Sequence, residues 1–118
     1  MAEVTRTEGQ LPWQHVHFVG VGGVGMAGLA HILADWGVEV TGTDAADSPM
    51  LATLAARGLG VCAPHGEAVP AEAGLVVYSN AVPPDNPERR DAEARGVPTC
   101  LRGEFLARLA THFPVVVS

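Results

Sequence analysis

Three glycines spaced as G-x-G-x-x-G are the residues of this sequence whose arrangement most clearly indicates chemistry. They are Gly20, Gly22 and Gly25, and they lie between an apolar, β-branched run and a helix-like run. In this context Gly20 lets the chain turn sharply, Gly22 lets the backbone approach a ligand, and Gly25 lets the helix pack close to the strand. The free N–H groups of the first helical turn, with the positive end of the helix dipole, form an anion site. The motif therefore predicts that a phosphate-bearing ligand binds here.

An acidic residue follows the next apolar run at the distance that nucleotide sites use. Asp44 lies 19 residues after Gly25, close to the roughly 20 expected of a carboxylate that binds a ribose. Two simpler interpretations stay open: the glycines could form a tight turn without a ligand, and Asp44 could cap the loop before a helix that starts near Ser48. The strand, the helix and the acid together favour nucleotide binding.

The elements that must position these residues alternate along the chain. Apolar runs predict strands, and Ser-Pro, Asn-Pro and glycine signals predict where helices begin and end. The expected strands are 16–21, 38–43, 60–63, 75–78 and 97–101, with a further strand signal at 115–117. The expected helices are 24–36, 50–57, 87–95 and 104–112. This alternation predicts an α/β fold: one Rossmann-like domain with a doubly wound parallel sheet of about five strands.

The polar candidates all follow predicted strands. Ligands of doubly wound sheets bind beyond the carboxyl ends of the strands, where the strand order reverses. The glycine loop (residues 20–25), Asp44, His65 and the pair Ser79 and Asn80 occupy such positions. We therefore expect them to converge on one ligand site.

Composition and charge argue against several classes of protein. The 118 residues carry a net charge of −6, which disfavours a non-specific nucleic-acid surface. No apolar run approaches the roughly 20 residues that a membrane span needs, and the polar opening is not a signal peptide. Cys62 and Cys100 lie in apolar runs without metal-ligand spacing. Buried reduced thiols and a cytoplasmic protein are expected.

Other polar residues have structural interpretations. The five histidines do not form a metal-ligand pattern, so no metal is expected. His15 and His17 are expected to be structural, and His65 is open between a ligand contact and an exposed loop residue. Ser79 lacks the partners of a nucleophile, so no catalytic residue is predicted. A solvated helix face is expected from Asp85, Glu88, Asp91 and Glu93 with Arg89, Arg90 and Arg95.

Beyond these patterns, residues 18–28, FVGVGGVGMAG, resemble the N-terminal signature of the bacterial Mur ligases. Four further segments occur in that family's order: TGTD at 41–44, VYSNAV at 77–82, DNPE at 85–88 and RGEFL at 102–106. The resemblance runs from about His15 to Ser118, nearly the whole chain. Because the segments form an ordered set, it is far more specific than the glycine motif alone.

The resemblance implies a three-domain ligase of peptidoglycan precursor synthesis that uses ATP to join L-alanine to the lactyl carboxylate of UDP-N-acetylmuramate. This chain would bind the UDP part of that substrate. Backbone N–H groups of the glycine loop would contact the diphosphate, Asp44 would accept a hydrogen bond from ribose or uracil, and His65 would lie near the uracil. The full set of implied contacts is Gly20, Gly22, Gly23, Val24, Gly25, Met26, Asp44, His65, Ser79, Asn80 and Ala81.

The same resemblance implies that the chemistry needs more than this chain. In the family an ATP-binding P-loop follows a strand that resembles residues 115–118, and this sequence contains no G-x-x-x-x-G-K-[ST]. We therefore expect a tail at 1–14, a UDP-sugar-binding domain at 15–113, and at 114–118 the first strand of an ATP-binding domain. ATP and magnesium would act in the parent enzyme, with its central and C-terminal domains as partners, and the chain alone would hold no cofactor and not be catalytic. An NAD-binding domain of a dehydrogenase or redox regulator is the alternative, because the same glycine loop can bind either ligand.

Overall fold

Five parallel strands form one sheet in a computed structural model that describes residues 13–23 and 25–110. The strands are β1 (His15–Val19), β2 (Glu39–Thr43), β3 (Gly60–Cys62), β4 (Leu75–Tyr78) and β5 (Thr99–Leu101). The helices are α1 (Met26–Asp35), α2 (Pro49–Ala56), α3 (Pro87–Arg95) and α4 (Arg102–Ala110). The order β3-β2-β1-β4-β5 confirms the predicted doubly wound sheet of five strands. The strand signal at 115–117 lies outside the described residues.

The strand order reverses between β1 and β4, and the register fixes what meets there. Val19, the last residue of β1, is opposite Thr43 of β2 and Tyr78 of β4. The residues that follow these three strand ends therefore leave the sheet side by side, at the edge where doubly wound sheets bind ligands.

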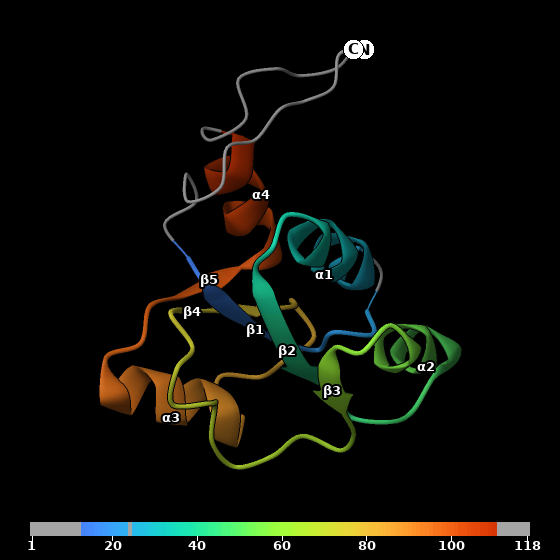
Figure 1. Cartoon of the computed structure of the whole chain (residues 1–118). Helices are drawn as coiled ribbons and strands as arrows, with labels where there is room; N and C mark the ends of the chain where they lie inside the picture. Colours follow the sequence, from blue (N-terminus) through green and yellow to red (C-terminus); the bar gives the residue numbers. More distant parts are fainter. Residues whose placement is uncertain (1–12, 24, 111–118) are drawn as a thin grey trace.

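Helices cover both faces of the sheet (Figure 1). On one face Val16 and Phe18 of β1 pack in a core with residues of α1, α2 and α4. On the other face Val19 packs with Ala92 of α3. β1 is buried along its whole length, which is the pattern expected of the central strand of a parallel sheet with helices on both sides.

Capping side chains begin the helices, and glycines end them, where the sequence signals predicted. Ser48 caps α2 by accepting a hydrogen bond from the Leu51 N–H at 3.2 Å. Asn86 caps α3 by accepting from the N–H groups of Glu88 and Arg89. After the carboxyl-terminal ends of α1, α2 and α3, the chain adopts a positive φ at Gly37, Gly58 and Gly96, respectively.

Several boundaries differ from the predicted ones, for local reasons. β1 ends at Val19 rather than at residue 21, because Gly20 has a φ of 90° and turns the chain away. α4 begins at Arg102 rather than at residue 104. Cys62 is exposed, contrary to its predicted burial, because its neighbours Val61 and Ala63 pack against the core and Cys62, between them, faces the other way. Cys100 is buried in the core as predicted.

Candidate functional site

The glycine loop is fastened to the end of β2. The N–H groups of Gly20 and Val21 both donate to the carbonyl oxygen of Thr43, at 2.8 and 3.0 Å. Gly20 and Gly25 have φ angles of 90° and 83°, which residues with a Cβ rarely adopt. At Gly25 the space for a Cβ is bordered by Arg102 and not by the strand. The third glycine of the motif is thus required by its φ, rather than by the predicted close packing of helix on strand.

Asp44 closes the loop through a direct contact with Gly22. Its Oδ2 accepts a hydrogen bond from the Gly22 N–H at 2.7 Å, and its Oδ1 accepts from the Ala45 N–H at 2.6 Å. A Cβ on Gly22 would lie 2.5 Å from that Oδ2. Glycine is therefore needed at position 22 for the approach of Asp44, whether or not a ligand approaches as well.

Some of the amides expected to bind the diphosphate already have partners. The Gly23 N–H donates to the Gly20 carbonyl oxygen, and the Met26 N–H donates to the Gly23 carbonyl oxygen, each at 3.0 Å. The Met26 side chain is fully buried in the core. Val24 lies outside the described residues. Contacts of these residues with a diphosphate stay a prediction, and they would require the loop to exchange hydrogen bonds.

A pocket of about 510 Å³ lies where the strand ends converge. Half of its lining comes from the predicted contacts Gly20, Gly23, Asp44, His65, Ser79 and Ala81. Pro83, Asp85 and Asn86 of the loop after β4 form part of its other wall. Gly22, Gly25, Met26 and Asn80 are not among the lining residues. The structure thus brings together residues from the loops that follow four strands, β1 to β4, as the carboxyl-end rule predicts.

His65 comes to this pocket from the connection after β3. Its Nδ1 lies 2.8 Å from the Thr43 hydroxyl, at the end of β2. Since His65 is partly buried and held by the sheet, it is not a free loop residue.

Arg102 does not line the pocket but lies beside Gly25, at the amino-terminal end of α1, and sequence reasoning gave it no ligand. It is the first residue of α4, directly after β5, and its Nη1 lies 3.4 Å from where a Cβ of Gly25 would be. Among the described residues it makes no hydrogen bond or ion pair. Its neighbour Glu104 instead caps α4, because its Oε1 accepts from the Leu101 N–H at 2.9 Å. The signal that could have found Arg102 is its position after a parallel strand.

Glu88 corrects the prediction of a solvated acidic face on α3. Its side chain is fully buried, and it accepts hydrogen bonds from His17 Nε2 at 2.7 Å, the Thr43 hydroxyl at 3.0 Å and the Gly66 N–H at 2.5 Å. Burial is the largest single influence and opposes ionisation, but these donors together outweigh it and lower the pKa of the Glu88 carboxyl. His17 is structural, as predicted.

The arginines of α3 divide between two surroundings. Arg89 leaves the predicted acidic face: its guanidinium lies 3.8 Å above the Tyr78 ring, and it donates to the Val82 carbonyl oxygen. Arg95 keeps the predicted pairing and bonds Asp91 at 2.8 Å. Arg89 thereby holds the loop after β4, which lines the pocket.

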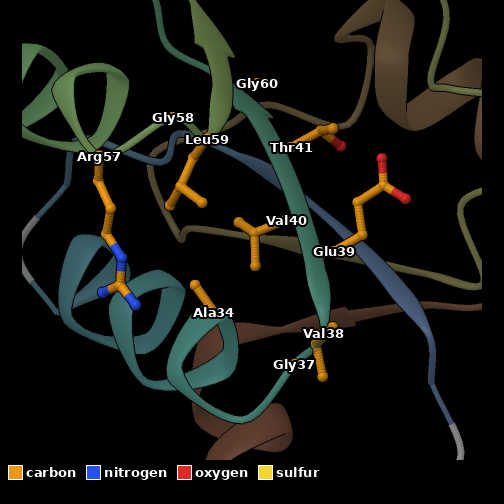
Figure 2. Close-up of a pocket in the computed structure, with 10 residues that line it drawn as sticks. All are labelled: Ala34, Gly37, Val38, Glu39, Val40, Thr41, Arg57, Gly58, Leu59 and Gly60. Atoms are coloured by element: carbon orange, nitrogen blue, oxygen red, sulfur yellow. The ribbon is translucent and has the colours of Figure 1, made fainter.

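A second pocket, of about 600 Å³, lies at the opposite edge of the sheet, where β2 and β3 begin. Figure 2 shows Ala34, Val40 and Leu59 turned toward the space between the sheet and the helices. Arg57 extends from the end of α2 toward α1 (Figure 2), where its guanidinium bonds the Asp35 carboxylate and the His31 ring. Because its cation is already paired and the carboxyl ends lie elsewhere, we do not assign the nucleotide to this pocket.

Two further findings concern only the part of the chain that the structure describes. It contains no group of three or more His, Cys, Asp or Glu residues placed to hold a metal ion. None of its helices combines the length and the apolar character that a bilayer crossing requires.

A parallel α/β domain with a glycine loop, an acid after β2 and a pocket at the strand-order reversal is a nucleotide-binding class of fold. Residues 15–114 match the Mur ligase family, catalytic domain. The chain therefore belongs to the Mur ligase family.

Relatives with similar sequences and structures belong to one group of ligases within this family. The UDP-N-acetylmuramate–L-alanine ligase of Sulfurihydrogenibium sp. is 45% identical over 94 residues, which are 80% of this chain and 21% of the relative. That of Rubrobacter xylanophilus is 46% identical over 94 residues, again 80% and 21%. The crystal structure of UDP-N-acetylmuramate–alanine ligase from Thermotoga maritima superposes with a TM-score of 0.78 at 30% identity, and the match covers 82% of this chain and 23% of that one. This chain thus spans about a fifth of the length of these relatives.

Proposed function

We propose that this chain binds the UDP moiety of UDP-N-acetylmuramate, as the N-terminal domain of a cytoplasmic ligase that adds L-alanine in peptidoglycan precursor synthesis. The observation that carries the proposal is the convergence of the glycine loop, Asp44, His65 and Ser79 on one pocket at the strand-order reversal. The names of the relatives supply the substrate.

The diphosphate has two sources of positive potential in this arrangement. The amino-terminal end of α1 carries a partial positive charge, and Arg102 lies beside Gly25 at that end. An arginine can donate two parallel hydrogen bonds to phosphate oxygens. Asp44 and His65, at the ends of β2 and β3, would then lie on the nucleoside side.

Catalysis is proposed to belong to the longer parent protein. The sequence contains no G-x-x-x-x-G-K-[ST], the loop that cradles the phosphates of ATP in many ligases and ATPases. We propose that ATP and magnesium act through the part of the parent that this chain does not span, and that the 118 residues alone bind substrate without ligating L-alanine.

The test is a titration of the purified chain with UDP-N-acetylmuramate and, separately, with NADH, followed by amide NMR shifts at Gly20, Gly23 and Ala81. Saturable shifts with the UDP-sugar alone support the proposal. Shifts with NADH alone would instead favour a dinucleotide-binding domain. No shifts with either ligand would refute binding by this chain on its own.

Arg102→Ala, measured against Arg90→Ala, tests the placement of the diphosphate. Arg90 is exposed on α3, so Arg90→Ala removes the same charge at a position that does not line the pocket. Charge-assisted hydrogen bonds contribute about 1.5–3 kcal/mol, so Arg102→Ala should weaken UDP binding roughly tenfold or more. It should leave uridine binding unchanged, because uridine has no phosphate. Equal losses for UDP and uridine would refute the assignment.

A further inference from the structure

Glu88 is the end point of hydrogen bonds that reach the pocket from inside the sheet. The buried carboxylate lies 3.0 Å from the Thr43 hydroxyl oxygen, and that oxygen lies 2.8 Å from Nδ1 of His65. His65 lines the pocket, whereas Glu88 does not. Thr43 is buried as well. One side chain therefore separates a buried charge from a residue of the proposed nucleotide site.

The direction of each hydrogen bond follows from counting protons. An ionised carboxylate can only accept hydrogen bonds, so the single hydroxyl proton of Thr43 is donated to Glu88. The Thr43 oxygen must then accept from His65, which requires a proton on Nδ1. In a neutral imidazole a proton on Nδ1 leaves Nε2 as an acceptor. Nε2 of His65 makes no hydrogen bond within residues 13–23 and 25–110.

We infer that Glu88 is a positioning residue of the nucleotide site: through Thr43 it holds His65 in the Nδ1–H tautomer, so that Nε2 is left to accept an N–H or O–H donor of the ligand. The lowered pKa of the Glu88 carboxyl keeps the carboxylate ionised and this direction fixed over the neutral pH range. The tautomer assignment stands on the free protein. Only the role of Nε2 toward UDP rests on the proposed function.

The isosteric substitution Glu88→Gln should reverse the direction of the hydrogen bonds between residue 88, Thr43 and His65. In Glu88→Gln the amide oxygen is needed where Oε2 now accepts the Gly66 N–H at 2.5 Å. The amide NH₂ group then takes the place of Oε1, and its two hydrogens are donated to the Thr43 oxygen and to His17 Nε2, so the His17 proton moves to Nδ1, beside Thr41. The Thr43 hydroxyl proton turns to His65 Nδ1, and the ring carries its proton on Nε2. The pocket nitrogen changes from an acceptor to a donor without a change in the size of any side chain in the chain of contacts.

The test is ¹⁵N NMR of histidine-labelled protein at a pH where the rings are neutral. Protonated and unprotonated ring nitrogens differ widely in ¹⁵N shift, so each tautomer is read directly. We expect Nδ1–H for His65 in the wild type and Nε2–H in Glu88→Gln. Thr43→Val removes the relay at nearly constant volume and should release the Nδ1–H preference. Thr41→Val is the matched control.

Thr41 lies two residues before Thr43 on β2, and its hydroxyl contacts His15 and His17 rather than His65. Its loss should therefore leave the His65 tautomer as in the wild type. A His65 tautomer that is unchanged in Glu88→Gln would overturn the inference. So would a His65 tautomer that changes in Thr41→Val but stays as in the wild type in Thr43→Val.

A binding measurement separates the inference from the proposed function. If the wild type binds UDP, Glu88→Gln should weaken that binding about tenfold, while Thr41→Val should not. A changed tautomer with unchanged UDP affinity would overturn the acceptor role of Nε2. A wild type that fails to bind UDP would refute the proposed function, whereas the tautomer spectra would still decide whether Glu88 positions His65.

Discussion

Gly22→Ala should damage the glycine loop through one contact. The added Cβ would lie 2.5 Å from Asp44 Oδ2 and 3.2 Å from Ser48 Oγ. Cβ atoms are not found that close to an oxygen, so Asp44 must move. Its hydrogen bond from the Gly22 N–H, now 2.7 Å, is then lost. The substitution therefore removes one of the contacts between the glycine loop and the end of β2, and the bonds from Gly20 and Val21 to Thr43 remain.

The magnitude follows from the kind of bond. Hydrogen bonds to charged groups contribute about 1.5–3 kcal/mol, and the partial exposure of both groups places this one near the lower value. We expect the free energy of unfolding to fall by about 1.5 kcal/mol, and the midpoint of thermal unfolding by roughly 5–10 °C. UDP binding should be lost, since the loop and Asp44 both border the pocket.

Gly28→Ala is the matched control. Gly28 lies inside α1, and a Cβ there would meet nothing within 4 Å. Alanine is favoured over glycine within a helix by about 0.5–1 kcal/mol, so this variant should be slightly more stable and bind UDP normally. Urea unfolding and UDP titration of both variants test the reasoning. A Gly22→Ala protein as stable as the wild type would refute the role given to the Asp44 contact.

Three further predictions concern parts of the fold away from the loop. At pH 8 a thiol reagent should label the exposed Cys62 and spare Cys100, whose pKa burial raises to about 11; urea should expose both to the reagent. Phe105→Ala should reduce the free energy of unfolding by about 3–5 kcal/mol, because this buried ring packs on Phe18 and Trp13; near-complete retention of stability in urea would contradict that packing. Folding lowers the pKa of Glu88, so its ionised carboxylate contributes fully to the free energy of unfolding above the unfolded-state pKa of about 4.3. This contribution is lost as the pH falls through the folded-state pKa. Glu88→Gln should therefore flatten the acid side of a profile of stability against pH.

Local signals were sufficient for most of the fold. Ser48 and Asn86 before prolines, and glycines after the last helical residue, act on neighbouring backbone groups, so the sequence contains both partners of each interaction. The parallel order of the sheet follows from the alternation of strands and helices. The carboxyl-end rule then places residues from distant segments at one edge, which is why the positions of His65 and Ser79 beside one pocket could be predicted without the structure.

The contacts that decide individual side chains lie far apart in sequence, and these could not be read from local patterns. Glu88 resembles its acidic neighbours on α3, yet its partner His17 is 71 residues away. An acidic side chain among arginines on a helix is ordinarily solvated. Only the folded sheet beneath α3 shows that the Glu88 carboxylate is buried and which groups donate hydrogen bonds to it. Arg102 is similar, because its proximity to Gly25 depends on how α4 packs.

The central place of β1 has a consequence for synthesis on the ribosome. Val16 is opposite Val40 on one side and Leu75 on the other, so one edge of β1 can pair long before its second partner exists. At about 5–20 residues per second, the nascent chain should pass a few seconds with that edge unpaired, open to strands of other chains. The ligand site is absent during this interval, because Ser79, which borders Gly20, arrives with the late strand. A nucleotide bound at the proposed site would therefore stabilise only the completed sheet and could not assist its early half to form.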